Sequence, residues 1–191
     1  MTNPKCDTMD KSLSTGPLAP LCAYLDSLTE RATIADLKAQ LHSPAVTVDD
    51  VAEFAQFSED RYLRNLIHEG EHYHLLVLCW RSGQRSPIHD HAGSTCGLRI
   101  LRGTATETVF ERSPSGLIKP VCSKDYCESD VSVSSDDFIH QVSNLQAKGQ
   151  DLVTLHVYSP PLLRTAAYSL TEPTIGEFRP MVLEHVLGSG I

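Results

Sequence analysis

The sequence predicts a mainly-β fold, a single barrel domain preceded by an α-helical layer, and three observations support this prediction. Apolar residues between positions 17 and 57 recur at three- and four-residue steps, which is the helical period. Beyond position 73, short β-rich runs alternate with turn signals, a pattern typical of sandwiches and barrels. The 191 residues suffice for one domain with its own hydrophobic core. We therefore expect a flexible tail over residues 1–16, a helical layer over 17–60 and a β-barrel over 61–191.

The individual elements follow from local patterns. The run LCAYLDSLTERATIADLKAQL has helical apolar spacing. Thr47 precedes VDDVAEFAQF, with Asp49 and Asp50 in the first turn, and this order predicts a capped helix start. The strands that we expect lie at residues 73–80, 104–111, 138–142, 152–158 and 178–186.

The composition excludes several classes of function. The formal net charge is −8 and no basic cluster is present, so we expect no binding to nucleic acid or to an anionic membrane. No run of eighteen apolar residues could span a membrane, and the polar start MTNPKCDTMDKSL is unlike a signal peptide. The six cysteines have no paired short spacing, which predicts reduced thiols in a cytoplasmic protein, and we expect a monomer. These cysteines are Cys6, Cys22, Cys79, Cys96, Cys122 and Cys127.

The segment GQRSPIHDHAGSTCGLRILRG, residues 83–103, predicts a metal site. Its His89 and His91 are two residues apart, and residues i and i+2 of a strand point to the same face. Neutral imidazole is a common ligand of iron, copper, zinc and nickel. The spacing of histidines and glycines resembles the first motif of the cupin barrels, with Cys96 where most of these proteins have a glutamate. His140 and Asn144 resemble the end of the second cupin motif, so we expect His89, His91 and His140 to converge inside the barrel.

The remaining histidines are expected to have structural roles. His72 and His74 form a second His-x-His pair, but no glycines bracket it at motif spacing. His42, His68 and His185 have no motif around them.

Three neutral histidines would leave the charge of a divalent ion uncompensated by protein. An anionic substrate group such as a thiolate would then bind well. Three protein ligands also leave up to three open positions, which suits a chelating substrate and dioxygen on iron(II).

Residues 62–161 resemble the cysteine dioxygenases, whereas the N-terminal region and the tail after residue 163 match them only loosely. The matching motifs are YLRNL, LCW, SPIHDH, STC, HQVSN and LHVYSPP. The resemblance implies a cupin fold and one iron(II) per chain, held by His89, His91 and His140. It also implies oxidation of free L-cysteine by O2 to cysteine sulfinic acid.

The same resemblance assigns roles to residues outside the metal site. Arg64 takes the position of the arginine that binds the substrate carboxylate, for which a planar guanidinium is well suited, and Tyr62 should border the same pocket. Tyr158, His156 and Cys96 take catalytic positions, with Thr154 and Trp80 supporting them.

Two further expectations concern the segment that ends in Tyr158. Thr154, His156 and Tyr158 alternate with apolar residues, so on a strand all three point inward and need hydrogen-bond partners. Cys96 and Tyr158 resemble a pair that some members of the family join by a thioether bond. A cis Ser159–Pro160 peptide bond would be a plausible way to aim Tyr158, because X-Pro bonds adopt the cis form at low cost.

Three alternatives remain open at this stage. One is a related dioxygenase that prefers 3-mercaptopropionate or another small thiol. Another is a non-catalytic cupin that binds a small molecule or a metal. The third is a metal-dependent isomerase or decarboxylase, although these commonly keep the glutamate that Cys96 replaces.

Overall fold

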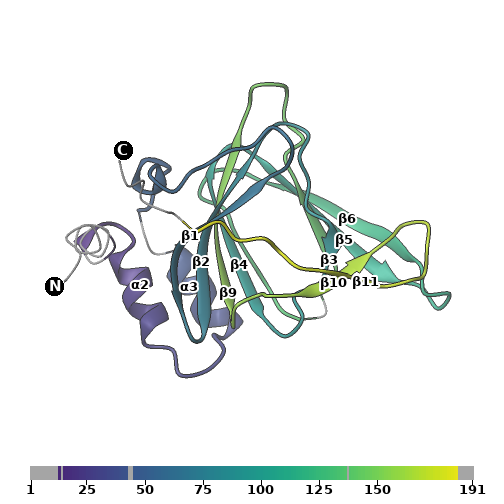
Figure 1. Ribbon diagram of the computed structural model, residues 1–191, viewed down its shortest axis with the longest axis horizontal. Helices are drawn as coiled ribbons and strands as arrows, with labels where there is room; N and C mark the ends of the chain where they lie inside the picture. The colour runs from purple at the N-terminus through teal and green to yellow at the C-terminus, as the bar shows by residue number, and fades with distance from the viewer. Residues whose placement is uncertain (1–12, 14, 43–44, 137, 185–191) are drawn as a thin grey trace, which may run out of the picture.

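The computed structural model describes residues 13, 15–42, 45–136 and 138–184 of the chain (Figure 1). It contains the helices α2 (Ala19–Asp26) and α3 (Ile34–His42) and the short 3-10 helix η1 (Asp49–Val51). The strands are β1 (Leu63–Gly70), β2 (Tyr73–Trp80), β3 (Ile88–His89), β4 (Thr95–Arg102), β5 (Ala105–Arg112), β6 (Ile118–Tyr126), β7 (Val131–Ser134), β8 (His140–Ser143), β9 (Leu152–Ser159), β10 (Thr165–Tyr168) and β11 (Gly176–Phe178).

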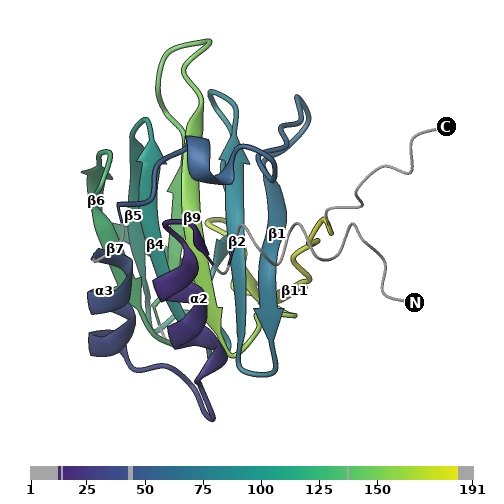
Figure 2. The same cartoon turned by 90° about the vertical axis from the view of Figure 1, so that its left-hand side faces the viewer.

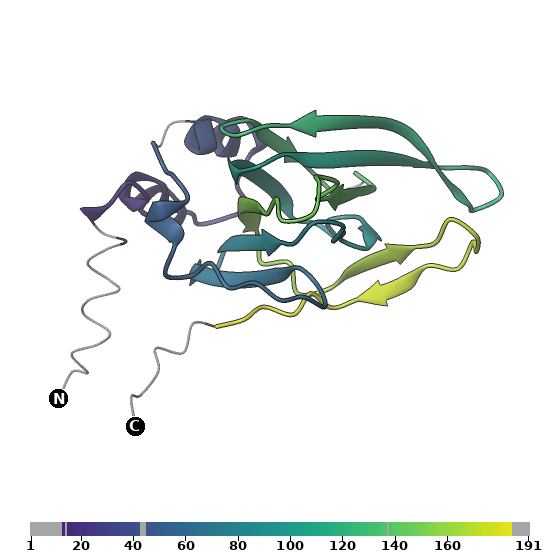
Figure 3. The same cartoon turned by 90° about the horizontal axis from the view of Figure 1, so that it is seen from above.

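Two antiparallel sheets form the barrel. The five-stranded sheet has the order β1-β2-β9-β4-β7, and the six-stranded sheet has the order β11-β10-β3-β8-β5-β6. Figure 3 shows the two sheets from above, with strands on both sides of a common interior. That interior is closed by one apolar cluster that joins Leu76, Leu98 and Leu152 of the first sheet to Ala105 and Val142 of the second. The predicted fold class, a β-barrel with an N-terminal helical layer, is therefore confirmed.

Helices α2 and α3 cover the outer face of the five-stranded sheet (Figure 2). In β2, Leu75, Val77 and Cys79 pack toward the helices, whereas Leu76, Leu78 and Trp80 pack into the barrel. Successive side chains of a strand point to opposite faces, and both faces of this strand are covered. The apolar run YHLLVLCW is uninterrupted for this reason, because every residue of β2 is buried.

Several expected elements differ from the structure. The helix expected after Thr47 is only the 3-10 turn η1, because Asp50 accepts hydrogen bonds from both the backbone N–H and the hydroxyl of Thr47, at 2.8 and 2.7 Å. A strand is expected at 178–186, and within its described part, 178–184, only Phe178 belongs to a named strand, although Leu183 forms an isolated bridge with Asn65.

Further differences concern the tail and the strands that local patterns did not predict. Within the expected flexible tail, Leu13 is buried in the cluster under the helices. The strands β1, β6, β7 and β10 were not among those expected.

Candidate metal centre and substrate pocket

His89, His91 and His140 meet inside the barrel, as the two motifs predicted. One ring nitrogen of each lies within 4.8 Å of those of the other two, and all three side chains are buried. His89 of β3 and His140 of β8 are directly paired across the six-stranded sheet. His91 lies just past the end of β3, so a turn and not a continuous strand brings it beside His89, with ring centroids 5.7 Å apart.

The glycines that frame this motif adopt backbone conformations that other residues rarely adopt. Gly83 and Gly103 have φ angles of 86° and 83°, in the region that side chains with a Cβ rarely adopt. At Gly103 a Cβ would also lie 2.7 Å from the carbonyl oxygen of Asp151. The glycine spacing thus reflects the turns that position the histidines.

The nitrogens of the three rings that face away from the centre are held by the surrounding chain. His89 Nδ1 lies 2.9 Å from the carbonyl oxygen of Pro87, and His140 Nδ1 lies 2.6 Å from Glu107 Oε1. The His91 ring has the Ser134 hydroxyl 3.5 Å from Nδ1 and a hydrogen bond with the backbone of Ser135. A carbonyl or carboxylate oxygen accepts only, so the Nδ1 atoms of His89 and His140 carry the proton, and Nε2 is left as a free ligand atom.

This arrangement fits a bound cation. His91 Nε2 and His140 Nε2 face each other at 3.1 Å. With the ring protons on the outer nitrogens, two lone pairs would meet there, and a shared cation satisfies both. Burial, together with the neighbouring His140, lowers the pKa of His89 to about 3 and that of His91 to about 2, so both rings are neutral and able to bind a metal near pH 7.

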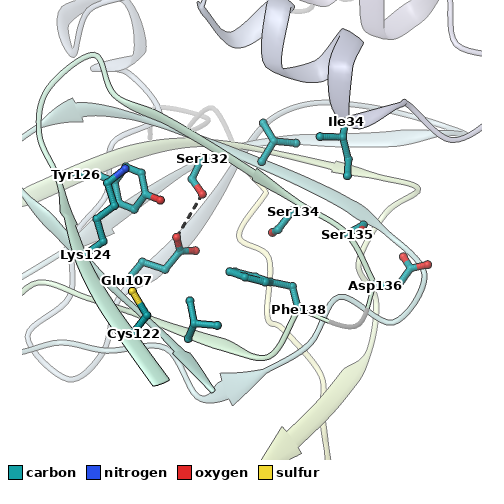
Figure 4. A pocket seen from close by; sticks show the side chains of 12 residues that line it. Ile34, Glu107, Cys122, Lys124, Tyr126, Ser132, Ser134, Ser135, Asp136 and Phe138 are labelled. Carbon is teal, nitrogen blue, oxygen red and sulfur yellow. Dashed lines mark hydrogen bonds between the residues drawn. The ribbon is translucent and has the colours of Figure 1, made fainter. Parts of the chain in front are cut away.

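Glu107 is a site residue that the motifs did not indicate. Figure 4 shows its carboxylate turned toward Ser132, whose hydroxyl donates to Oε2 at 3.2 Å, while Oε1 takes the hydrogen bond of His140. Burial raises the pKa of Glu107, but its hydrogen bonds, chiefly the one with His140, lower it more, so the net pKa is below the usual value. The sequence led us to expect that the protein supplies no negative charge near the metal. This is corrected, because the buried carboxylate of Glu107 accepts a hydrogen bond from His140, one of the three candidate ligands.

A separate cavity of about 600 Å³ lies on the other side of Glu107 and shares no lining residue with the pocket at the histidines. Figure 4 shows Ser134 and Phe138 facing this cavity with Glu107. Glu107 thus separates the candidate metal centre from the space behind it.

Arg64 lies in the same interior as the histidines, at 4% exposure. Its Nη1 donates to the Tyr158 hydroxyl at 3.1 Å, and Tyr62 lies beside the guanidinium. Among the described residues, Arg64 Nε and Nη2 are buried and reach no acceptor with hydrogen-bond geometry. A buried charged group with unused donors is costly unless a ligand pairs with it, which makes these two N–H groups a candidate anion site.

Thr154, His156 and Tyr158 of β9 point into the barrel, as their alternation predicted. The Thr154 hydroxyl lies 2.9 Å from His156 Nε2, and His156 Nδ1 lies 3.4 Å from the Tyr158 hydroxyl. Trp80 Nε1 donates to Thr154 at 3.1 Å, and the Trp80 ring stacks on Tyr62 with centroids 4.1 Å apart. One line of hydrogen bonds therefore runs from Trp80 through β9 to Tyr158.

Cys96 and Tyr158 are direct neighbours on adjacent strands. They are paired residues of β4 and β9, and the thiol has a hydrogen bond with the tyrosine side chain. Burial is the main cause that raises the pKa of Cys96 to about 12, so the thiol is protonated. Burial also raises the pKa of Tyr158 above its usual value. The Ser159–Pro160 peptide bond that follows is cis.

The other motif residues have structural partners. Asn144 donates to the carbonyl oxygens of Trp80 and Gln150, at 3.1 and 2.9 Å, and ties the end of β8 to β2 and to the turn before β9. His74 pairs with Glu69 and His68 with Asp26, away from the centre. His185 lies outside the described residues.

In the described part of the chain, no helix has the length and apolar character needed to cross a membrane.

Solved structures with a similar fold include two bacterial proteins. A protein with a double-stranded beta-helix domain from Klebsiella pneumoniae has a TM-score of 0.45 and 15% identity, and the match covers 58% of this chain and 86% of that one. A cupin superfamily protein from Desulfitobacterium hafniense has a TM-score of 0.44 and 16% identity, with 56% and 84% covered.

Closer relatives carry the name cysteine dioxygenase type 1. The protein of Danio rerio is 38% identical over 117 residues, which are 59% of this chain and 58% of that protein. The protein of Rattus norvegicus is 32% identical over 151 residues, which are 75% and 74% of the two chains. The family model described as "Cysteine dioxygenase type I" matches residues 8–171. The chain therefore belongs to the cysteine dioxygenase type I family, and its barrel has the cupin fold expected from the histidine motifs.

Proposed function

We propose that this chain oxidises the thiol of free L-cysteine with dioxygen to cysteine sulfinic acid, at one iron(II) held by His89, His91 and His140. The observation that carries the proposal is the buried Arg64, whose unpaired N–H groups share a cavity with the histidines. A substrate that satisfies both features needs a metal-binding group at one end and a carboxylate at the other. Iron(II) would supply coordination of the thiolate and amine and activation of dioxygen.

Arg64 fixes the orientation of the substrate. A carboxylate that pairs with Nε and Nη2 forms a two-point contact, which restrains rotation as well as position. Tyr62 closes the pocket beside it, held flat by its stack on Trp80. The cavity at the histidines is lined by these residues, so a substrate bound there would contact protein on several sides.

Tyr158 holds a proton at the wall of the cavity that the histidines and Arg64 line. Its hydroxyl oxygen accepts from Arg64 Nη1, and its raised pKa keeps the phenol protonated. Burial and the charge of Arg64 lower the pKa of His156, so the imidazole is neutral and relays a hydrogen bond between Thr154 and Tyr158. The hydroxyl of Tyr158 can then donate to an oxygen atom that binds in the pocket.

We also propose a thioether bond between Cys96 and Tyr158. The sulfur would bond to the ring carbon next to the phenol oxygen, with two hydrogens lost to dioxygen. Support comes from the direct pairing of the two residues across β4 and β9. Mass spectrometry of tryptic peptides after turnover should find a linked pair lighter by two hydrogens, and recovery of only separate peptides would count against the bond.

The compartment and the assembly are part of the same proposal. The five described cysteines are free, which suits the reducing cytoplasm. We propose a cytoplasmic monomer, to be tested by sedimentation of the purified protein.

A dioxygenase for 3-mercaptopropionate is the second candidate, because that thiol carries the same carboxylate that Arg64 could pair with. It lacks the amine and would bind the metal through fewer atoms. Oxygen uptake measured with each thiol decides between the two substrates. A higher kcat/KM for 3-mercaptopropionate than for cysteine would make 3-mercaptopropionate the preferred substrate.

The test of the main proposal is anaerobic loading with iron(II), addition of cysteine and air, and analysis of the product. Sulfinic acid should form in step with oxygen uptake, whereas a binding module would produce none. Arg64→Ala should lower kcat/KM by about 100-fold, since it removes two charge-assisted hydrogen bonds. Arg112→Gln, a change at an exposed arginine of β5, is the matched control. Unchanged kinetics in Arg64→Ala would show that the carboxylate site is elsewhere.

A further inference from the structure

A larger pocket adjoins the small cavity at the histidines. It encloses about 350 Å³, and Tyr62 and Arg64 line both spaces. We call this outer pocket the arginine vestibule, because Arg61, Arg85 and Arg179 also line it. Its position makes it the space through which a substrate would reach Arg64.

The C-terminal segment forms one wall of the vestibule. Leu183 N–H donates to the carbonyl of Arg64 at 2.8 Å, and Leu66 N–H donates to the carbonyl of Leu183 at 2.9 Å. These bonds tie the segment after β11 to β1, and Figure 3 shows it running beside that strand. Phe178 and Met181 give this wall an apolar surface between the arginines.

The charge of the vestibule is opposite to that of the molecule. The chain has a net charge of −8, with 24 acidic and 16 basic residues, yet the lining holds four arginines and no carboxylate. Arg179 has an exposed partner in Glu177 at 2.6 Å, and Arg61 contacts only the sulfur of Met181 at 3.9 Å among the described residues. The Arg85 side chain is exposed, and no hydrogen bond or ion pair holds it within the described part of the chain. Like charges repel, and Arg61 and Arg85 have no acidic partner among the described residues, so an anion that binds between them best explains the grouping.

We propose that Arg61, Arg85 and Arg179 form an outer binding subsite for the carboxylate of the incoming thiol, before it pairs with Arg64. This inference rests on the proposed function, because it assigns the anion to the substrate of that site. The subsite pairs with the carboxylate of the substrate at the entrance and disfavours thiols that lack a carboxylate. The subsite does not touch the reacting atoms. It therefore affects the binding of substrate and leaves the rate of the chemical step unchanged.

The test combines kinetics with direct binding of an anion, using Arg61→Gln/Arg85→Gln and the control Arg112→Gln. In the iron-loaded protein, the double variant should lower kcat/KM for cysteine roughly tenfold at low ionic strength, about two- to fivefold for each exposed charge, with kcat unchanged. The difference in kcat/KM between the double variant and the unmodified protein should disappear at about 0.5 M salt, where the Debye length is roughly 4 Å. An equal loss at all salt concentrations, or no loss at low salt, would overturn the proposal.

The binding arm uses inorganic sulfate, a small anion that can pair with arginine without a metal or turnover. Calorimetry should show that sulfate binds the unmodified protein and the Arg112→Gln control, but binds the double variant several-fold more weakly. Equal binding to all three proteins, or none to any, would reject the subsite. This arm needs no turnover, so it separates failure of the subsite from failure of the proposed function.

Discussion

Glu107 holds a ligand histidine of the candidate metal centre from behind. Its carboxylate fixes the proton of His140 on Nδ1 and turns Nε2 toward the other two histidines. Carboxylates behind metal-binding histidines orient the ring and make it a better donor to the metal. Glu107 would therefore act as a positioning residue for the metal centre.

Substitution of Glu107 should weaken metal binding in a graded way. Glu107→Gln keeps an acceptor for the His140 ring but removes the negative charge, whereas Glu107→Ala removes both. We expect metal affinity to fall by about 10- to 100-fold for alanine and by less for glutamine. Equilibrium titration with iron(II) or cobalt(II), followed by the ligand spectrum of the cobalt form, measures this without turnover.

Glu111 provides the control for this prediction, because it is an exposed glutamate on the same strand, β5. Glu111→Gln should bind metal as the unmodified protein does. If Glu107→Ala retained the same affinity as this control, the positioning role would be wrong.

The sequence predicted the residues of the site that lie in short motifs, and it missed those that depend on strand pairing. His89 and His91 were found by spacing, and Arg64 by the family motif around it. Glu107 reaches His140 only because β5 pairs with β8, with Val109 opposite His140. The only local sign was a glutamate at the same strand phase as the buried Ala105, in TATETVFE.

At the scale of elements, strands covered on both faces were predictable and strands exposed to solvent were not. The bounds of β2 were predicted from its unbroken apolar run, and those of β9 to within one residue. Strand β6 is exposed along most of its length, so it has no apolar alternation to detect. The helix expected at Thr47 fails for another reason, because the same Thr and Asp residues that cap a helix also close a single turn.

The contact between α3 and β4 depends on Gly97, which follows Cys96 and points to the opposite face. A Cβ at this position would lie 2.5 Å from Leu41 Cδ1 and 3.0 Å from Leu37 Cδ2, and both leucines are fully buried. Gly97→Ala should therefore lower the free energy of unfolding by about 1–3 kcal/mol through overpacking. Urea denaturation measures the change.

A double-mutant cycle provides the internal control. Leu41→Ala alone should cost about 2–5 kcal/mol because it leaves a void. In Gly97→Ala/Leu41→Ala the new methyl group enters that void, so the combined loss should be smaller than the sum of the two. Strict additivity would show that the helix does not rest on Gly97.

At the scale of the whole molecule, the barrel buries several imidazoles in one interior, and this couples its stability to pH. Burial lowers the pKa of His89 to about 3 and that of His91 to about 2, and it also lowers the pKa of His156. In the unfolded chain each imidazole has a pKa near 6.5. Between these values the unfolded chain binds protons that the folded chain does not, so the free energy of unfolding falls as the pH falls.

We predict that the metal-free protein loses stability steadily as the pH is lowered from 7 to 5. His89, His91 and His156 should each contribute about 1.4 kcal/mol per pH unit once the pH is below 6.5, and for His89 this continues toward pH 3. Urea denaturation at several pH values measures the slope. His91→Gln should reduce the slope by the contribution of one histidine, whereas His42→Gln, a change at an exposed position, should leave the slope unchanged.

Added metal binds only the folded, neutral ligand set, so it should raise stability most near neutral pH. A metal-free protein equally stable at pH 7 and pH 5 would mean that the folded barrel takes up protons on these rings, and the neutral three-histidine centre would then be wrong.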